Sequence, residues 1–339
     1  MIGQPDKKKR MLAIALLILP LVAFVVSLGI GTYPVSPRAL VWAVAHPGGG
    51  TPPEGISPAV RDVLFRIRLP RLILGLAVGA ALSISGASLQ ALFKNPLVNE
   101  YILGISSGSA VGAALSLVFL GRSFPPQLAA FVFAVIAVGA VLLISGKAET
   151  HSISLLLTGI IVTAFFSALL SLIEFFASPY VLQALFFWLM GSLSLASWKD
   201  LYISVPLIVV GVVFLVLLRW RFNVLSMSEE EARSLGVNVR REKILVIAAA
   251  TLVTSAATSV VGIIAWLGFI VPHLVRLMFG ADNRKVVPLS AALGAAVVVI
   301  ADDIIRGLSA FEIPIGIFTS LIGIPVFILL LKKARKVWL

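Results

Sequence analysis

The 339-residue sequence contains no cysteine and only three histidines, His46, His151 and His273. The absence of cysteine excludes disulfides, thiolate nucleophiles and cysteine-ligated metals. Because histidine is so scarce, a histidine-rich metal site is nearly excluded as well. We therefore expect no metal site and no cofactor.

Charge is also scarce: charged residues make up 12% of the chain and hydrophobic residues 60%, and the mean hydropathy is +1.09. Soluble domains carry about 25% charged and about 45–50% apolar residues. So little polar surface cannot cover a soluble globule of this size, which excludes a soluble enzyme. Long apolar runs, rather than short alternating segments, predict an all-α polytopic membrane protein.

Ten apolar runs are expected to form one transmembrane domain over residues 1–339. The Pro/Gly-rich stretch 32–64 is predicted to be an extracytoplasmic loop, and the polar stretch 219–243 a cytoplasmic segment. The ten predicted helices cover residues 11–30, 69–92, 102–120, 127–146, 152–177, 200–218, 243–264, 267–280, 286–308 and 314–331.

The net charge of +12 is interpreted as a sign of topology and of contact with anionic membrane lipid, not with nucleic acid. Ten crossings place both termini on one side. Most of the 27 basic residues fall on that side, which predicts cytoplasmic N- and C-termini. A smaller outer group opposes this bias and includes Arg68, Arg71 and Arg306.

A shift of 176 residues aligns the second and seventh predicted helices, with Gly86 on Gly262 and Pro96 on Pro272. We interpret this alignment as a weak internal repeat. An offset of five helices gives the two units opposite membrane orientation, and such inverted repeats are common in transporters.

Motifs for catalysis are weak. The sequence lacks a Walker phosphate loop, so no ATPase site of that kind is expected in this chain. Gly104–Gly108 matches the G-x-S-x-G pattern of serine hydrolases, but its context is helical, so a membrane protease is only a distant alternative. The intramembrane acids Glu174, Asp302 and Asp303 lie near the outer ends of their helices, which argues against an ion-driven carrier.

The polar segment 219–243 carries clear helix signals. Ser228 followed by Glu231 is a capping box, and Gly236 stands where a helix would end. We predict a short cytoplasmic helix, which is either an ordinary solvated loop element or a docking site for a partner.

These features, taken with several longer stretches, resemble the FecCD family of permeases, the membrane subunits of ABC importers for iron-siderophore complexes, haem and vitamin B12. The resemblance covers residues 11–333. The matching stretches are Arg68–Arg71, Gly79–Gly86, Gln90–Leu97, Leu103–Gly108, Ala232–Gly236, Gly268–His273, Pro288–Ser290, Ala301–Asp302, Pro314–Gly316 and Leu321–Gly323.

The resemblance implies a type II ABC importer permease with ten helices in the cytoplasmic (inner) membrane. The cargo would be an iron chelate (siderophore or haem) or cobalamin, moved by ATP hydrolysis in separate subunits, so the chain is not itself an enzyme. Its partners would be a second permease subunit, expected to be an identical copy, two cytoplasmic ATPase subunits and an extracytoplasmic substrate-binding protein. An ion-coupled secondary transporter is the alternative.

The resemblance also implies site residues. The outer arginines Arg68, Arg71 and Arg306 would meet acidic residues of the binding protein. Glu174 departs from the apolar or neutral residue expected in its helix and is a candidate for the outer vestibule. The stretch 219–243 would couple the permease to the ATPases, and the residues expected to do so are Ser228, Glu231, Ala232, Arg233, Leu235 and Gly236.

Overall fold

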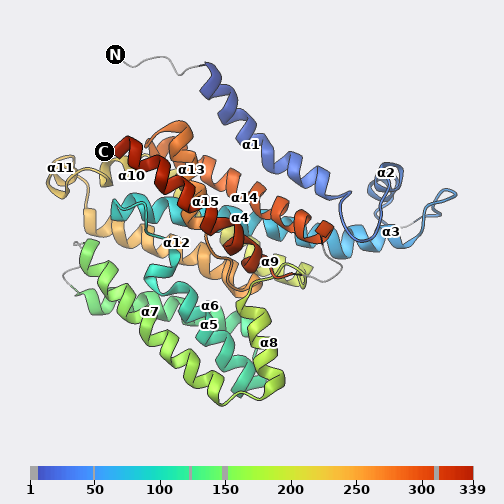
Figure 1. The fold of residues 1–339 in the computed structure, drawn as a ribbon, viewed down its shortest axis with the longest axis horizontal. Helices are drawn as coiled ribbons and strands as arrows, with labels where there is room; N and C mark the ends of the chain where they lie inside the picture. The colour runs from blue at the N-terminus through green and yellow to red at the C-terminus, as the bar shows by residue number, and fades with distance from the viewer. Residues whose placement is uncertain (1–6, 49, 122–123, 147–151, 309–312, 339) are drawn as a thin grey trace.

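The computed structural model describes residues 7–48, 50–121, 124–146, 152–308 and 313–338, and across these ranges the chain is helical without a strand. A helix lies in each of the ten predicted segments, so the all-α class is confirmed (Figure 1). The α-helices are α1 (Lys7–Ser27), α2 (Pro37–Ala45), α3 (Ala59–Asp62), α4 (Leu69–Phe93), α5 (Ile105–Leu115), α6 (Pro126–Ser145), α7 (Ser152–Phe175), α8 (Pro179–Leu189), α9 (Trp198–Leu217), α10 (Arg221–Leu225), α11 (Glu229–Ser234), α12 (Val239–Val261), α13 (Leu267–Phe279), α14 (Asn283–Leu308) and α15 (Ile315–Trp338).

Among the described residues, seven helical stretches are long and apolar enough to cross a membrane. Shorter apolar helical segments account for the rest: α5 with the π-helical turn Ser116–Leu120, then α8, α13 and the part Ile315–Leu330 of α15. The helix α8 was not predicted, because its eleven residues are too few to read as a crossing.

The long helices run between two ends of the bundle. One end carries α2 and α3 and is called the α2 end; the other carries α10 and α11 and is called the α11 end (Figure 1). The start of α1 and the end of α15 both lie at the α11 end (Figure 1). The first helix therefore begins, and the last helix ends, on the same side of the bundle.

The centre of the bundle is built from α4, α12 and α14. Within the most apolar window of each helical stretch, 78% of residues are buried for α4, 72% for α12 and 61% for α14, against 17% for α1 and 28% for α7. In a membrane, a helix that is apolar on all sides either packs in the centre of a bundle or faces lipid, and burial separates the two groups here.

Glycines allow the central helices to touch through their backbones. A Cβ added at Gly86 would lie 1.8 Å from the carbonyl oxygen of Gly268, and one added at Gly79 would lie 2.2 Å from that of Gly294. The two glycines thus allow close packing of α4 on α13 and α14.

A break in helical structure follows each of the central helices α4 and α12. The chain leaves α4 at Lys94, which has left-handed backbone angles, and α5 begins only at Ile105. A second break separates the end of α12 at Gly262 from Trp266, which precedes α13 and has a φ of 73°. Gly86 lies inside α4, whereas Gly262 ends α12, so the two helices that the 176-residue shift aligns end at different points of the alignment.

Candidate functional site

A buried ion pair joins α4 and α14 at the α2 end. Nε of Arg71 donates to Oδ2 of Asp302 at 2.9 Å, and Nη2 donates to Oδ1 at 2.8 Å. Both side chains are less than a tenth exposed. The paired geometry satisfies both carboxylate oxygens, which is what makes two charges tolerable in a low-dielectric interior.

Arg306 extends this pair to the end of α1. Its Nε lies 3.1 Å from Oδ2 of Asp302, one helical turn back, and its Nη2 pairs with Asp303. Asp303 also accepts a hydrogen bond from the hydroxyl of Ser27, the last residue of α1. The sequence pattern Asp302-Asp303-x-x-Arg306 places all three side chains on neighbouring positions of one helix face.

Arg68 holds the connection that follows α1. Its guanidinium donates to the backbone carbonyls of Leu28 and Tyr33. Gly31 lies against the same guanidinium, since a Cβ there would come within 2.8 Å of Arg68 Nη2. Arg306 makes a similar contact, from Nη1 to the carbonyl of Ile30 at 2.9 Å.

The three arginines expected at the surface are thus inside the fold. Arg68 is 3% exposed and Arg71 is 7% exposed, and the Arg306 side chain is 9% exposed. We call Arg68, Arg71, Arg306, Asp302 and Asp303 the arginine cluster. The distribution of basic residues predicted that the three arginines lie at the same end of the protein. Sequence reasoning missed that Asp302 and Asp303 pair with arginines inside the fold. Among the described residues, the exposed basic side chains at the α2 end include those of Arg38, Arg66 and Lys199.

At the α11 end, the predicted capping box is present. The hydroxyl of Ser228 accepts a hydrogen bond from the N–H of Glu231 at 3.2 Å, and the Glu231 carboxylate accepts one from the N–H of Ser228 at 3.0 Å. This backbone hydrogen bond, with the Ser228 hydroxyl second, lowers the pKa of Glu231. The helix α11 is therefore capped by its own side chains.

The rest of this segment divides into an anchor and an exposed surface. Ala232 is 1% exposed, whereas Leu235 is 60% exposed and Arg233 is also exposed. Gly236 has a φ of +79°, and the N–H of Val237 donates to the carbonyl of Ala232 at 3.2 Å, which closes the helix. We call residues 228–236 the coupling segment.

Polar contacts that sequence reasoning missed tie this region to three long helices. Lys94, at the end of α4, donates to the backbone carbonyl of Met227. Lys243 of α12 pairs with Glu229 at 2.8 Å. The region also contacts the start of α14 through Asn223. These partners are 14 to 133 residues apart in sequence, so no local pattern could identify them.

Glu174 lies near the end of α7 and is only partly buried. The residues that follow it, Phe175 and Phe176, are 81% and 63% exposed, and Tyr180 at the start of α8 is 87% exposed. This end of α7 therefore presents aromatic rings around one acid. A buried acid that sequence reasoning missed is Glu100, which is 1% exposed and lies next to Gly268 at the start of α13.

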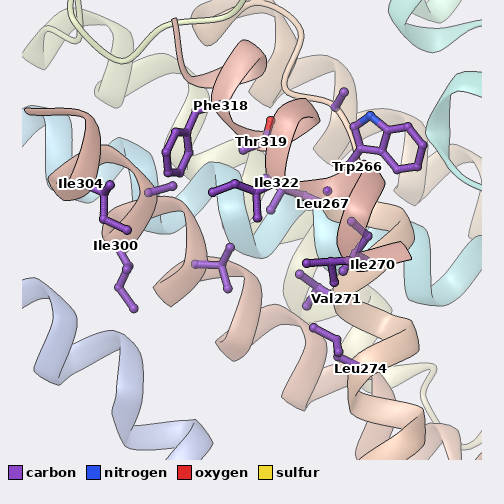
Figure 2. A pocket seen from close by; sticks show the side chains of 15 residues that line it. Trp266, Leu267, Ile270, Val271, Leu274, Ile300, Ile304, Phe318, Thr319 and Ile322 are labelled. Atoms are coloured by element: carbon purple, nitrogen blue, oxygen red, sulfur yellow. The ribbon is translucent and has the colours of Figure 1, made fainter. Parts of the chain in front are cut away.

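An apolar cavity of about 260 Å³ lies between α13, α14 and α15. Figure 2 shows Ile300 and Ile304 of α14 and Phe318 and Ile322 of α15 along its wall. Its one hydroxyl, that of Thr319, donates to the carbonyl of Gly316 within its own helix. Apart from Thr319 and the indole N–H of Trp266, the side chains that line the cavity are apolar, which does not suit a charged ligand.

The G-x-S-x-G match does not form a nucleophile elbow. A 3₁₀ turn, Glu100–Leu103, precedes Gly104, and the match forms the first turn of α5. Gly108 packs against α6, because a Cβ there would lie 2.6 Å from the carbonyl oxygen of Phe133. A strand before the serine is needed for that motif, so this glycine spacing serves helix packing.

These features define a polytopic helical membrane protein with a capped helix at one end and a buried charge cluster at the other. The sequence profile of the FecCD transport family matches residues 17–333. The chain belongs to this family.

Individual proteins agree with that assignment. An iron chelatin transport system permease of Helicobacter pylori is 40% identical over 81% of this chain and 84% of its own length. The molybdate import permease MolB of Haemophilus influenzae is 38% identical over 98% of both chains. A solved structure, an inward-facing metal-chelate type ABC transporter, aligns with a TM-score of 0.85 and 35% identity over 96% of this chain and 99% of its own. The chain is a permease subunit of an ABC importer.

Proposed function

We propose that this permease subunit carries an iron chelate, either a siderophore complex or haem, or cobalamin, across the cytoplasmic membrane. The observation that carries the proposal is the family match over residues 17–333, joined by similarity to a permease of an iron chelatin system. A chelated metal arrives within its own ligands, so the permease needs only a wide pathway with weak contacts.

Molybdate is a second candidate cargo. The relative named for molybdate import matches this chain over 98% of both lengths. An oxyanion is smaller and more strongly hydrated than a chelate, so the two cargoes differ in the pathway they need.

The α11 end is proposed to be cytoplasmic, with both chain termini on that side. Its basic side chains include Lys7–Arg10 at the start of α1 and Lys285 at the start of α14, which agrees with the bias of basic residues toward the cytoplasm. On this end the exposed surface of the coupling segment is available to one of two cytoplasmic ATPase subunits. Ala232 would hold the segment to the permease while Leu235 and Arg233 meet the ATPase.

The α2 end is proposed to receive an extracytoplasmic substrate-binding protein. The buried positions of Arg68, Arg71 and Arg306 support a different task from direct contact, namely holding the segment after α1 in place. Direct contact with an acidic partner falls instead to the exposed Arg38 and Arg66. Glu174 is proposed to lie in the vestibule between two identical permease subunits.

Uptake by cells with and without this gene tests the cargo. We expect the deletion to abolish uptake of one labelled compound among ferric siderophores, haem, cobalamin and molybdate, and the gene in trans to restore it. Unchanged uptake of all four would contradict the cargo proposal.

The energy source is tested on the same uptake. Vanadate should stop it, whereas a protonophore that leaves ATP levels intact should not. Glu100 gives the ion-coupled alternative its one specific observation, since a buried acid is what a proton-coupled carrier uses. Uptake that resists vanadate and is lost in Glu100→Gln would favour that alternative.

A further inference from the structure

Asn223 of α10 uses both ends of its side-chain amide to hold the turn between α13 and α14. Its Nδ2 donates to Oδ1 of Asp282 at 2.8 Å, and its Oδ1 accepts from the backbone N–H of Asn283 at 2.9 Å. The contact joins residues 59 and 60 positions apart. Asn223 lies within the stretch 219–243 that the sequence predicts to be cytoplasmic, but outside residues 228–236.

The two sides of this contact are themselves fixed. Arg284 holds Asp282, with Nε 3.0 Å from Oδ1 and Nη2 3.1 Å from Oδ2. These hydrogen bonds from Arg284, followed by that from Asn223, lower the pKa of Asp282 to about 2, so the carboxylate is charged at neutral pH. On the other side Phe222, the neighbour of Asn223, is fully buried and anchors α10.

Both elements that Asn223 joins lead to proposed sites of action. The helix α10 ends three residues before Ser228, where the coupling segment begins. The helix α14 has 26 residues and therefore spans about 39 Å. Its far end carries Asp302, which pairs with Arg71 in the arginine cluster. Asn223 thus stands where a short, ATPase-facing element meets a helix that crosses the whole bundle.

We propose that Asn223 is a positioning residue for coupling, which transmits displacement of the coupling segment to α14 through the turn at Asp282 and Asn283. The inference rests on the proposed docking of the coupling segment on an ATPase. A hydrogen bond to a charged carboxylate is stronger than one between neutral groups, so this contact persists when the segment moves. Through its two hydrogen bonds, Asn223 makes the first turn of α14 move together with α10, so the two helices do not slide past each other.

The experiment uses the complete complex in lipid nanodiscs, assembled with the ATPase and binding protein of its own transport system. The readout is the ratio of ATP hydrolysis with cargo-loaded binding protein to hydrolysis without it. Asn223→Ala should lower this ratio by about fivefold or more, the scale of a coupling free energy between sites. Basal hydrolysis and the amount of bound ATPase should stay at the wild-type level.

Two further variants separate transmission from damage to the fold. Asn223→Asp places a carboxylate against Asp282 and should lower the ratio further. Asn223→Asp combined with Asp282→Asn exchanges the amide and the carboxylate, keeps an acceptor for the N–H of Asn283, and should restore most of the ratio. Lys285→Ala is the matched control, because it removes an exposed basic side chain from the same turn while keeping the hydrogen bonds of Asn223 and Arg284 to Asp282, and should leave the ratio unchanged.

Each outcome decides the proposal. A wild-type ratio in Asn223→Ala overturns it, and so does an exchange variant that recovers no more than Asn223→Asp alone. If Asn223→Ala fails to assemble, recovery in the exchange variant decides in the same way. Failure of the underlying function would show differently, because then the wild-type complex itself would bind no ATPase and show no stimulation.

Discussion

The carboxylate of Asp302 faces the guanidinium of Arg71 across 231 residues of sequence, with two contacts of 2.8 and 2.9 Å. The pair ties the start of α4 to the end of α14, and Arg306 and Arg68 extend the tie to the connection after α1. These charged side chains, which the sequence alone would place at the surface, thus join the end of α1, the start of α4 and the end of α14.

Breaking this pair should destabilise the protein strongly. Arg71→Ala leaves Asp302 without its two-point partner, and removal of one member of a buried pair costs about 3–5 kcal/mol. Thermal unfolding of the purified protein in detergent measures the effect. Arg66→Ala is the control, because its pair with Asp62 is exposed and is worth about 0–1 kcal/mol. Equal effects of the two variants would contradict the assigned role of Arg71.

Replacing Gly86 by alanine should prevent normal folding. The new Cβ would lie 1.8 Å from the carbonyl oxygen of Gly268, so α4 and α13 must separate. Overpacking of this kind costs about 1–3 kcal/mol or more. Size-exclusion profiles of a fluorescent fusion should show aggregation for Gly86→Ala and a wild-type peak for Gly139→Ala, where nothing lies within 4 Å of the added atom. A monodisperse Gly86→Ala protein would disprove the close contact.

The exposed surface of the coupling segment should carry the ATPase. Leu235→Asp places a charge on a side chain that is 60% exposed, so the permease fold should survive while ATPase binding is lost. Co-purification of the ATPase with tagged permease measures this. Leu195→Asp is the matched control, since that leucine is 90% exposed at the opposite end. If both variants lose the ATPase, or if neither does, the proposed binding of the ATPase at Leu235 is contradicted.

The absence of cysteine makes topology directly testable. Cysteines introduced for Lys285 at the α11 end and Lys199 at the α2 end are both exposed. An impermeant maleimide added to intact spheroplasts should label position 199 and not 285, and inverted vesicles should give the reverse. The opposite pattern would invert the proposed orientation.

The pH dependence of stability should reflect Asp282. Its pKa of about 2 in the folded state lies below the usual 3.8, so its contribution is complete above pH 4 and is lost as the pH falls toward 2. The melting temperature of Asp282→Asn should therefore lie below that of wild type at pH 7, and the gap should narrow between pH 4 and pH 2. A gap independent of pH would show that the charge of Asp282 contributes nothing.

Sequence patterns predicted what depends on neighbours along the chain. The apolar runs marked the ten helices, and Ser228, Glu231 and Gly236 marked both ends of α11, because hydropathy and capping act over a few residues. The helix α8 was not predicted because it is too short to cross a membrane. The pairing of Arg71 with Asp302 and of Asn223 with Asp282 was not predicted, because the partners lie far apart in sequence and meet only in the packed bundle. The burial of the outer arginines escaped for the same reason.

The direct backbone contacts at Gly79 and Gly86 carry a mechanical consequence. Where two helices meet with no side chain between them, neither can slide or rotate past the other without a collision of main-chain atoms. We therefore expect α4, α13 and α14 to move as one rigid unit. Alternation between open and closed pathways would then tilt these three helices together and leave their mutual contacts unchanged.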